Sequence, residues 1–268
     1  MAAEALVVLA GQVGANALPI FLALLAALLV LMTGGWWALR AHVPERAHSR
    51  LPQAAFVLLN GLVGFAIVIS AAALFAEIAE ALGPDGAMSL ADEALAASLR
   101  THVSATTLQA FAAFTHFGDV LTLTLLSVAM ALLLWLLRRR ALALGWVLAL
   151  GGNALLNPML KRVFERVRPV HEHGIVSELG WSFPSGHSSS STVAYGMLAY
   201  LAVRTLPAAW HLPAVLGATA LVFTVACSRI FLQVHFASDV AAGVASGAAW
   251  LTVCIVTMEL SRLCHRRV

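Results

Sequence analysis

The chain has 268 residues, of which 61% are hydrophobic and only 11% are charged. Because soluble domains carry about a quarter charged residues, this composition excludes an ordinary soluble domain and indicates that lipid surrounds much of the chain. The net charge of +3 is small and divided among several loops, which argues against a nucleic-acid partner, and three cysteines are too few for a disulfide scaffold.

Seven apolar segments are long enough to cross a hydrocarbon core, which requires about 20 residues per helix. The expected fold is therefore all-α, a polytopic membrane helical bundle. No basic region precedes the first segment, so it is expected to be a retained span rather than a signal peptide. Residues before Asn16 are expected to form a short helix at the membrane interface. The predicted spans are 17–40, 53–81, 119–137, 141–160, 188–206, 212–231 and 236–258.

Arginines predict the orientation of these spans. They cluster between spans one and two, between spans three and four, at the end of span five and at the C-terminus: Arg40, Arg46, Arg50, Arg138, Arg139, Arg140, Arg204, Arg262, Arg266 and Arg267. If the helices alternate, all of them fall on one side, which should be cytoplasmic. Residues 161–168, KRVFERVR, are strongly basic on the opposite side. Because orientation does not explain that run, we expect it to be functional.

The basic run contains Lys161, the only lysine of the chain, and Arg168 seven residues later. That spacing is about two helical turns, so both side chains are expected on one helix face. Pro169 is expected to end the helix at Arg168. The interpretation is a pair of cations directed at one spot. The alternative is an interfacial helix whose basic side chains reach lipid headgroups.

A second cluster, Pro184-Ser185-Gly186-His187, forms a predicted turn directly before span five. The N-terminus of a helix presents free N–H groups that suit an anion. Ser185 can donate a hydrogen bond to that anion, Gly186 allows close backbone approach, and His187 can deliver a proton near neutral pH. The alternative is a serine N-cap beside an incidental histidine.

A third cluster combines Arg229, His235 and Asp239 near the junction of the last two spans. His235 and Asp239 are four residues apart, which places them on one face if the segment is helical. A carboxylate bonded to one imidazole nitrogen makes the other nitrogen a better nucleophile or base. Arg229 could clamp phosphate oxygens with its planar fork. The alternative is an ion pair that stabilises the helix.

The three clusters lie on one predicted membrane face and together supply three cations, two histidines, a carboxylate and a serine. We infer that these groups bind a tetrahedral oxyanion such as phosphate. Phosphate needs several fixed donors for its oxygens, and its transfer needs a nucleophile and an acid. At Lys161 to Pro169, Pro184 to His187 and Ser228 to Asp239, the motifs K-x6-R-P, P-S-G-H and S-R-x5-H-x3-D stand complete and in order. This trio resembles the signature of the type-2 phosphatidic acid phosphatase (PAP2) superfamily.

The resemblance implies a role for each matching residue. His235 would attack phosphorus and form a phosphohistidine, Asp239 would orient His235, and His187 would protonate the leaving oxygen and then activate water. The phosphate oxygens would be held by Lys161, Arg168, Ser185, Gly186 and Arg229. The family needs no metal, and we expect no cofactor.

The resemblance also implies an integral-membrane lipid phosphatase with a six-helix core. The first apolar segment lies outside the resemblance and is expected to be an extra N-terminal transmembrane helix. The expected divisions are 1–50, a helix with a cytoplasmic loop; 51–260, the phosphatase domain; and 261–268, a basic cytoplasmic tail. Expected partners are membrane lipids and a lipid-phosphate substrate: phosphatidic acid, phosphatidylglycerol phosphate or undecaprenyl diphosphate, with a slight preference for a diphosphate because of the basic run. The expected location is a bacterial inner membrane, with the site on the periplasmic face and the C-terminus in the cytoplasm.

Two alternatives remain open on the sequence. One is a lipid-to-lipid phosphotransferase that uses the same site, and the other is a membrane transporter, although transporter sites usually lie near the bilayer midplane. Outside the three motifs, His171, Glu172, His173 and Glu178 are interpreted as a solvated loop, and the alternative is that they shape the substrate entrance or respond to pH. Asp119 is interpreted as the N-cap of span three, with a supporting role near the site as the alternative.

Overall fold

The computed structural model describes residues 2–42, 53–83, 86–170, 176 and 178–265, and these contain helices and loops but no strand. The predicted all-α fold is therefore confirmed. The α-helices are α1 (Ala2–Ala15), α2 (Ala17–His42), α3 (Gln53–Glu80), α4 (Ala87–His102), α5 (Ala105–Thr115), α6 (Val120–Leu136), α7 (Arg140–Phe164), α8 (Gly186–Thr205), α9 (His211–Phe231) and α10 (Ala237–His265), with short 3-10 turns η1 (His116–Gly118) and η2 (Ala208–Trp210).

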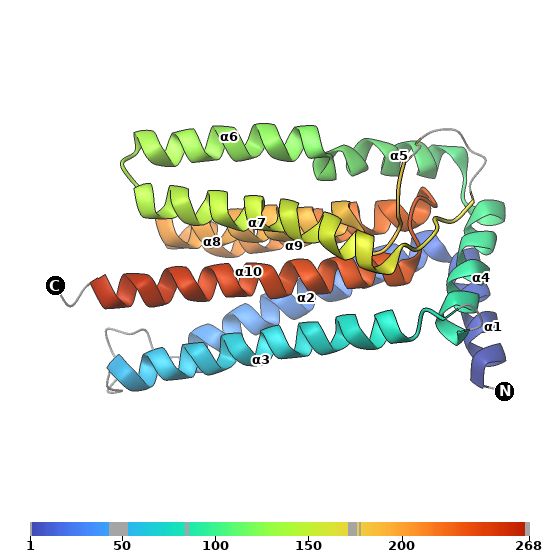
Figure 1. The fold of residues 1–268 in the computed structure, drawn as a ribbon, viewed down its shortest axis with the longest axis horizontal. Coiled ribbons are helices and arrows are strands. Elements are labelled where there is room, and N and C mark those ends of the chain that lie inside the picture. Colours follow the sequence, from blue (N-terminus) through green and yellow to red (C-terminus); the bar gives the residue numbers. More distant parts are fainter. Residues whose placement is uncertain (1, 43–52, 84–85, 171–175, 177, 266–268) are drawn as a thin grey trace.

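Each of the seven predicted spans corresponds to one long helix, and these helices alternate in direction along the bundle (Figure 1). Five of them, α2, α3, α7, α9 and α10, are long and apolar enough to cross a membrane, and α5 with α6 passes the same test as one span bent by 41°. The remaining long helix, α8, begins with four consecutive serines after His187 and is mostly buried among other helices. Because the neighbours of α8 are protein rather than lipid, the helix tolerates these serines.

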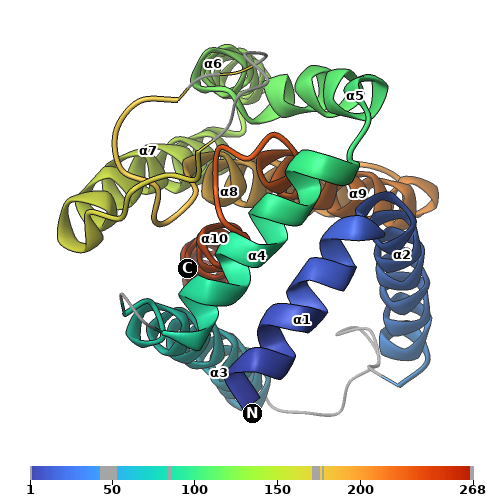
Figure 2. The same ribbon diagram turned by 90° about the vertical axis from the view of Figure 1, so that its right-hand side faces the viewer.

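Two helices lie across one end of the bundle rather than along it. Figure 2 shows α1 and α4 side by side over this end, and Figure 1 shows them crossing the ends of the long helices. The short helix expected before Asn16 is therefore present as α1. Within the segment 82–118, to which the sequence assigned no role, α4 covers this end, whereas α5 runs along the bundle and continues through η1 into α6 (Figure 1).

The arginine-rich connections gather at the other end of the bundle. Arg40, Arg138 to Arg140, Arg204 and Arg262 lie at or near the helix ends farthest from α4 (Figure 1). Arg46, Arg50, Arg266 and Arg267 are outside the described residues. The described arginines therefore lie at one end of the bundle, as the assumed alternation of helix directions predicted.

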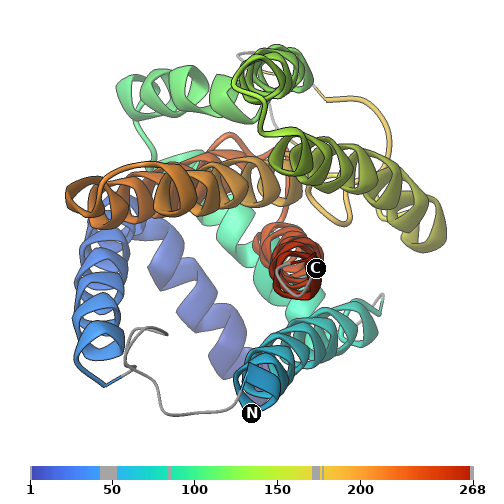
Figure 3. The ribbon, with the colours of Figure 1, turned by 90° about the vertical axis from the view of Figure 1, so that its left-hand side faces the viewer.

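Helix α8 packs tightly against α10, which lies between α3 and the layer formed by α7, α8 and α9 (Figure 3). Two glycines of α10, four residues apart, make this close approach possible. A Cβ atom on Gly243 would lie 2.5 Å from the carbonyl oxygen of Ser185, and one on Gly247 would lie 2.7 Å from that of Ser189. Small residues at this spacing let helix backbones approach closely within membranes.

The N-terminal helix α2 is joined to the rest of the bundle by an aromatic cluster. The Phe21 ring stacks on Phe223 with centroids 5.6 Å apart and meets Phe111 edge-on at 5.1 Å. Phe111 in turn stacks on Phe231 at 4.1 Å. The buried cluster also contains Leu232 and Val234, which lie in the connection from α9 to α10. The extra helix therefore supports the segment that carries His235.

We predict that Gly247→Leu destabilises the protein, because the new side chain would collide with the backbone of α8. Overpacking of this kind costs about 1–3 kcal/mol or more. Thermal unfolding of the purified protein in detergent should show a lower Tm. The control is Gly217→Leu on α9, where a Cβ meets nothing within 4 Å. Equal Tm values for the two variants would contradict the packing argument.

Candidate functional site

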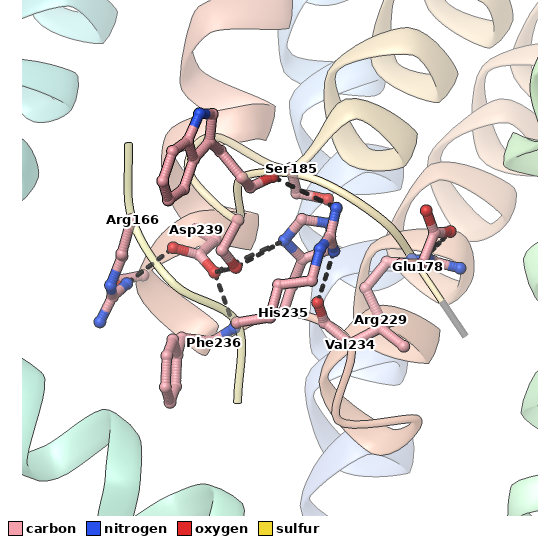
Figure 4. Close-up of polar contacts among 12 residues, drawn as sticks. Arg166, Glu178, Ser185, Arg229, Val234, His235, Phe236 and Asp239 are labelled. Atoms are coloured by element: carbon pink, nitrogen blue, oxygen red, sulfur yellow. Dashed lines mark hydrogen bonds and ion pairs between the residues drawn. The ribbon is translucent and has the colours of Figure 1, made fainter. Parts of the chain in front are cut away.

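The three sequence clusters meet at the end of the bundle that α4 covers. The first comes from the end of α7 and the chain after it, the second from the start of α8, and the third from the end of α9 and the start of α10. Figure 4 shows Asp239 between Arg166 and His235, with Glu178 beside Arg229. The predicted convergence is therefore present, although some of the reasoning behind it was wrong.

Lys161 and Arg168 do not share a helix face, as their spacing had suggested. Helix α7 ends at Phe164, and Glu165 adopts a left-handed conformation with φ of 44° that turns the chain. Arg168 lies in the non-helical segment beyond it. The two cations still meet, because Lys161 Nζ and Arg168 Nη2 both donate to the carbonyl oxygen of Trp181, at 2.6 and 3.2 Å.

His235 and Asp239 also approach each other without sharing a helix. Helix α10 begins at Ala237, so Asp239 lies in its first turn and His235 in the preceding connection. The connection bends at Gln233, which has φ of 52°. His235 Nδ1 lies 3.5 Å from Asp239 Oδ2, and the Phe236 N–H donates to the same oxygen at 2.9 Å.

The surroundings of His235 define which of its nitrogens carries the proton. Arg168 Nη1 donates to Nε2 at 3.0 Å, so Nε2 is the acceptor and Nδ1 carries the hydrogen. Nδ1 lies 3.2 Å from the hydroxyl of Ser182, which donates in turn to Asp239. Burial lowers the pKa of His235 to about 3. The imidazole is therefore neutral at pH 7, and its Nε2 lone pair accepts the hydrogen bond from Arg168.

Arg229 is fully buried and binds Thr115 and Glu178. The Glu178 carboxylate also lies 3.9 Å from His187 Nδ1. Burial alone would raise the pKa of Glu178, but the charges of Arg229 and His187 and the hydrogen bond from Arg229 hold it below its usual value. Glu178 is thus an ionised member of the site, and interpreting it as a solvated loop residue was wrong. His171, Glu172 and His173 lie outside the described residues.

His187 is held from behind by a carboxylate. Its Nε2 pairs with Asp119 Oδ1 at 2.8 Å, while the other oxygen of Asp119 pairs with His116 Nδ1 at 2.7 Å. Asp119 stands at the N-cap position of α6 but makes no capping hydrogen bond with its side chain. Asp119 is therefore the N-cap residue of α6 by position only, and its side chain pairs with His187 and His116 instead, which agrees with the alternative of a supporting role near the site.

Ser185 is the N-cap of α8: its hydroxyl accepts from the Ser188 N–H at 3.4 Å and from the Ser188 hydroxyl at 2.9 Å. This is the alternative that the sequence analysis left open for this residue. Gly186 follows it and begins the helix beside Asn157, whose Oδ1 would be 3.1 Å from a Cβ at that position. The N-terminus of α8 is therefore directed at the site, as expected.

A cavity of about 540 Å³ opens between the site and the membrane-spanning helices. Lys161, Arg168, His187 and His235 line its polar end, whereas Ser185, Arg229 and Asp239 do not line it. Along α6, α7 and α8 its walls become mainly apolar and include Val120, Leu123, Val128, Leu150, Ala154 and Val193. Glu178 lines the cavity in front of Arg229. Arg229 itself does not line the cavity, but its hydrogen-bond partner Glu178 does.

Several residues of the site were missed by the sequence analysis. Ser182, Asp92 and Asn157 carry no motif, and they approach the site only through the folding of α4, α7 and the chain before α8. Arg166 belonged to the basic run that orientation left unexplained, which was the only signal for any of the four. Among the described residues, His, Cys, Asp and Glu do not gather in groups of three or more that could hold a metal ion.

The chain resembles several known membrane phosphatases. Phosphatidylglycerophosphatase B of Bacillus subtilis is 36% identical over 135 residues, which are 50% of this chain and 66% of that protein. Decaprenylphosphoryl-5-phosphoribose phosphatase of Mycobacterium tuberculosis is 33% identical over 141 residues, 50% of this chain and 70% of that protein. The crystal structure of a transmembrane PAP2 type phosphatidylglycerolphosphate phosphatase from Bacillus subtilis matches with a TM-score of 0.67 and 30% identity, over 72% of this chain and 96% of that chain.

The model of the PAP2 superfamily matches residues 140–262, which include all three motifs. The solved relative extends the likeness beyond the motifs to most of the helical bundle. This chain, with its alternating apolar helices and its converging cations and histidines, belongs to the PAP2 superfamily.

Proposed function

We propose that this membrane lipid phosphatase of the PAP2 superfamily hydrolyses a phosphomonoester on a lipid headgroup, with the hydrocarbon chain held between its helices. The observation that carries this proposal is the cavity, which is cationic at one end and mainly apolar along the other walls. A lipid phosphate has the same division of charge. Val120 and Val128 line the cavity and are exposed on α6, so its apolar part borders the surface that lipid would cover.

The side chains of the basic run support a monoester over a diphosphate. Only Lys161 and Arg168 of this run line the cavity, whereas Arg162 is exposed and Arg166 binds two carboxylates behind the site. The cationic charge that faces a substrate is therefore smaller than the sequence suggested. Phosphatidylglycerol phosphate and phosphatidic acid fit this charge, and undecaprenyl diphosphate, the weakly preferred substrate of the sequence analysis, becomes less favourable.

In the mechanism that we propose, His235 Nε2 attacks phosphorus and the ester bond to the lipid oxygen breaks. Arg168 would turn from Nε2 to a phosphate oxygen, while its hydrogen bonds to the carbonyl oxygens of Gly180 and Val234 keep it in place. Lys161 and the N–H groups at the start of α8 would bind the other oxygens. The imidazole gains positive charge as the phosphohistidine forms, and Asp239 stabilises that charge through Nδ1–H and Ser182.

His187 is placed to supply the proton that the leaving lipid oxygen needs. Asp119 fixes its Nε2, so the other ring nitrogen, Nδ1, faces the cavity side where Glu178 lies. In the second step the same imidazole would take a proton from water, which attacks the phosphohistidine and releases inorganic phosphate. Ser185 would act by capping and aligning α8, and Arg229 by binding a phosphate oxygen after Glu178 withdraws.

The proposed location follows from the two ends of the bundle. The site is at the end opposite the arginine-rich connections, and the positive-inside rule assigns those connections to the cytoplasm. We therefore propose a bacterial inner membrane, with the site on the outer face and the C-terminus inside. A thiol-reactive probe that cannot cross membranes would test this, because a cysteine placed at Leu179, which is 95% exposed, should be labelled in intact cells.

The first prediction for the reaction concerns the two histidines. His235→Ala should lose turnover by about a thousandfold or more, because no other group can form the phosphoenzyme, and His187→Ala should also lose most turnover. Phosphate release in detergent micelles measures both, and EDTA should leave the wild-type rate unchanged. A His235→Ala variant that retains half of the wild-type activity would rule out His235 as the nucleophile.

The second prediction concerns the substrate. We expect phosphatidylglycerol phosphate and phosphatidic acid to be hydrolysed with kcat/KM at least about tenfold above that of undecaprenyl diphosphate, since the cavity presents few cations. A panel at equal detergent and lipid measures this. Faster release from the diphosphate would overturn the proposed headgroup. Radiolabel that moves from the donor to an acceptor lipid rather than to water would identify a phosphotransferase instead.

The third prediction concerns Glu178, whose carboxylate competes with phosphate for Arg229. Glu178→Gln should lower KM by roughly three- to tenfold and leave kcat within about threefold, because the substrate no longer displaces an ionised carboxylate. Inorganic phosphate should also inhibit this variant more strongly. Glu80→Gln is the control, since Glu80 is an exposed carboxylate at the end of α3. A higher KM in Glu178→Gln would instead make Glu178 a substrate-binding residue.

A further inference from the structure

We propose that Arg166 and Asp92 are positioning residues that hold the Asp239 carboxylate against His235, so that helix α4 is part of the active site. Neither is a defining residue of the three motifs: Arg166 occupies an unspecified position within K-x6-R-P, and Asp92 lies outside the part of the chain that the family model matches. The inference rests on the proposed roles of His235 and Asp239.

Asp239 is fully buried, and its two oxygens have different partners. Oδ2 faces His235 and accepts hydrogen bonds from Ser182 and from the Phe236 N–H. Oδ1 faces away from the histidine and accepts from Arg166 Nη1 at 2.6 Å. Arg166 is thus the cation that compensates the buried charge of Asp239 on the side away from the reaction, and it fixes the rotation of the carboxylate.

Arg166 is itself held on several sides. Its Nη2 pairs with Asp92 Oδ2 at 3.0 Å, and its Nη1 also donates to the Ser238 hydroxyl at 2.7 Å. The ring centroid of Phe236 lies 4.3 Å from its guanidinium carbon. Its backbone carbonyl oxygen accepts from the Ser182 N–H at 2.7 Å. Arg166 therefore positions both Asp239 and the serine that lies between Asp239 and His235.

Asp92 connects this arrangement to α4. Besides Arg166, it accepts hydrogen bonds from the N–H of Ser238, at 3.2 Å, and from the Ser238 hydroxyl. Ser238 directly precedes Asp239, so Asp92 binds both the start of α10 and the arginine that pairs with Asp239. Burial raises the pKa of Asp92 despite the hydrogen bonds from Ser238 and Arg166, so its negative charge depends on these partners.

The charges around Asp239 indicate what the loss of Arg166 would do. Arg166 and His235 contact Asp239 directly. Lys161 and Arg168 interact with the Asp239 charge from the cavity side. Asp92 lies on the far side of Arg166. Without Arg166, two buried carboxylates would share a site with no cation between them. A carboxylate in that position takes up a proton more readily as the pH falls, and a protonated Asp239 is a poorer acceptor for the Nδ1–H of His235.

The experiment compares kcat and KM for the wild type, Arg166→Gln, Arg166→Lys and Asp92→Asn on a phosphomonoester lipid in micelles from pH 5.5 to pH 8. Arg166→Gln should lose about tenfold or more in kcat at pH 7.5 with KM within about threefold, because Arg166 does not line the cavity. The ratio of its kcat to that of the wild type should fall by a further factor of about five or more towards pH 5.5. Arg166→Lys, which keeps the charge, should recover part of the loss.

The double variant tests whether the two residues act together. Asp92→Asn alone should lower kcat less than Arg166→Gln does. In the Arg166→Gln background, Asp92→Asn should cost nothing further, because it removes one of two unneutralised carboxylates, so the two losses should not multiply. The controls are Arg162→Gln and Glu93→Gln, exposed neighbours of the same charge, which should retain the wild-type kcat.

Three results would overturn the proposal: a constant ratio of variant to wild-type kcat across the pH range, a loss that appears in KM rather than in kcat, or multiplicative losses in the double variant. If Arg166→Gln cannot be purified as a folded protein, Arg166→Lys and Asp92→Asn decide the question by the same kcat and pH measurements. A wild type without phosphatase activity, or an active Asp239→Asn variant, would instead refute the proposed function.

Discussion

Ionised side chains buried at the end of an apolar bundle need compensating charges, and this requirement organises the whole site. Behind His235, the carboxylates of Asp239 and Asp92 share one arginine. In front of it, Lys161 and Arg168 are held by backbone carbonyl oxygens. Because neutral carbonyls fix these side chains without cancelling their charge, their attraction for an anion is retained. The arrangement separates a neutralised region behind His235, the proposed nucleophile, from a cationic region in front of it, where we propose that phosphate binds.

Glu178 lies on the cavity side of the site, next to Arg229, in the position that we propose for an anion. A fully buried arginine without any counter-charge would be costly, so the Glu178 carboxylate stabilises the protein, and in the proposed mechanism the substrate replaces it. This explains why a residue in a polar loop becomes an ionised part of the site. It also explains why Arg229 lies behind the cavity wall rather than in it.

The position of the site depends on helix packing as much as on its own residues. Gly243 and Gly247 let α10 approach α8, and this contact places Asp239 beside the chain that leads into α8: the Ser185 N–H donates to the Asp239 carbonyl oxygen at 2.9 Å. The serines after His187 also contribute, since Ser189 donates to Asn153 Oδ1 at 2.6 Å and ties α8 to α7. The N-terminal part supports the same end through the aromatic cluster around Phe21 and through Asp92. It is a structural component of the active site.

The sequence alone located the seven long helices, because most of them must match the thickness and composition of the hydrocarbon core. It did not fix all of their ends, since α7 extends to Phe164 and α10 to His265, beyond the predicted residues 160 and 258. It also identified the chemical groups of the site, since K-x6-R-P, P-S-G-H and S-R-x5-H-x3-D are contiguous motifs. It could not determine how those groups meet: Lys161 with Arg168, and His235 with Asp239, approach through turns at Glu165 and Gln233 and not along a helix face. The partners of Arg166, Asp92, Asp119 and Glu178 were decided by the tertiary structure. Each of these side chains pairs with a residue distant in sequence. The reason is physical: a buried charge must be neutralised by a group that is near it in space, whatever their separation along the chain.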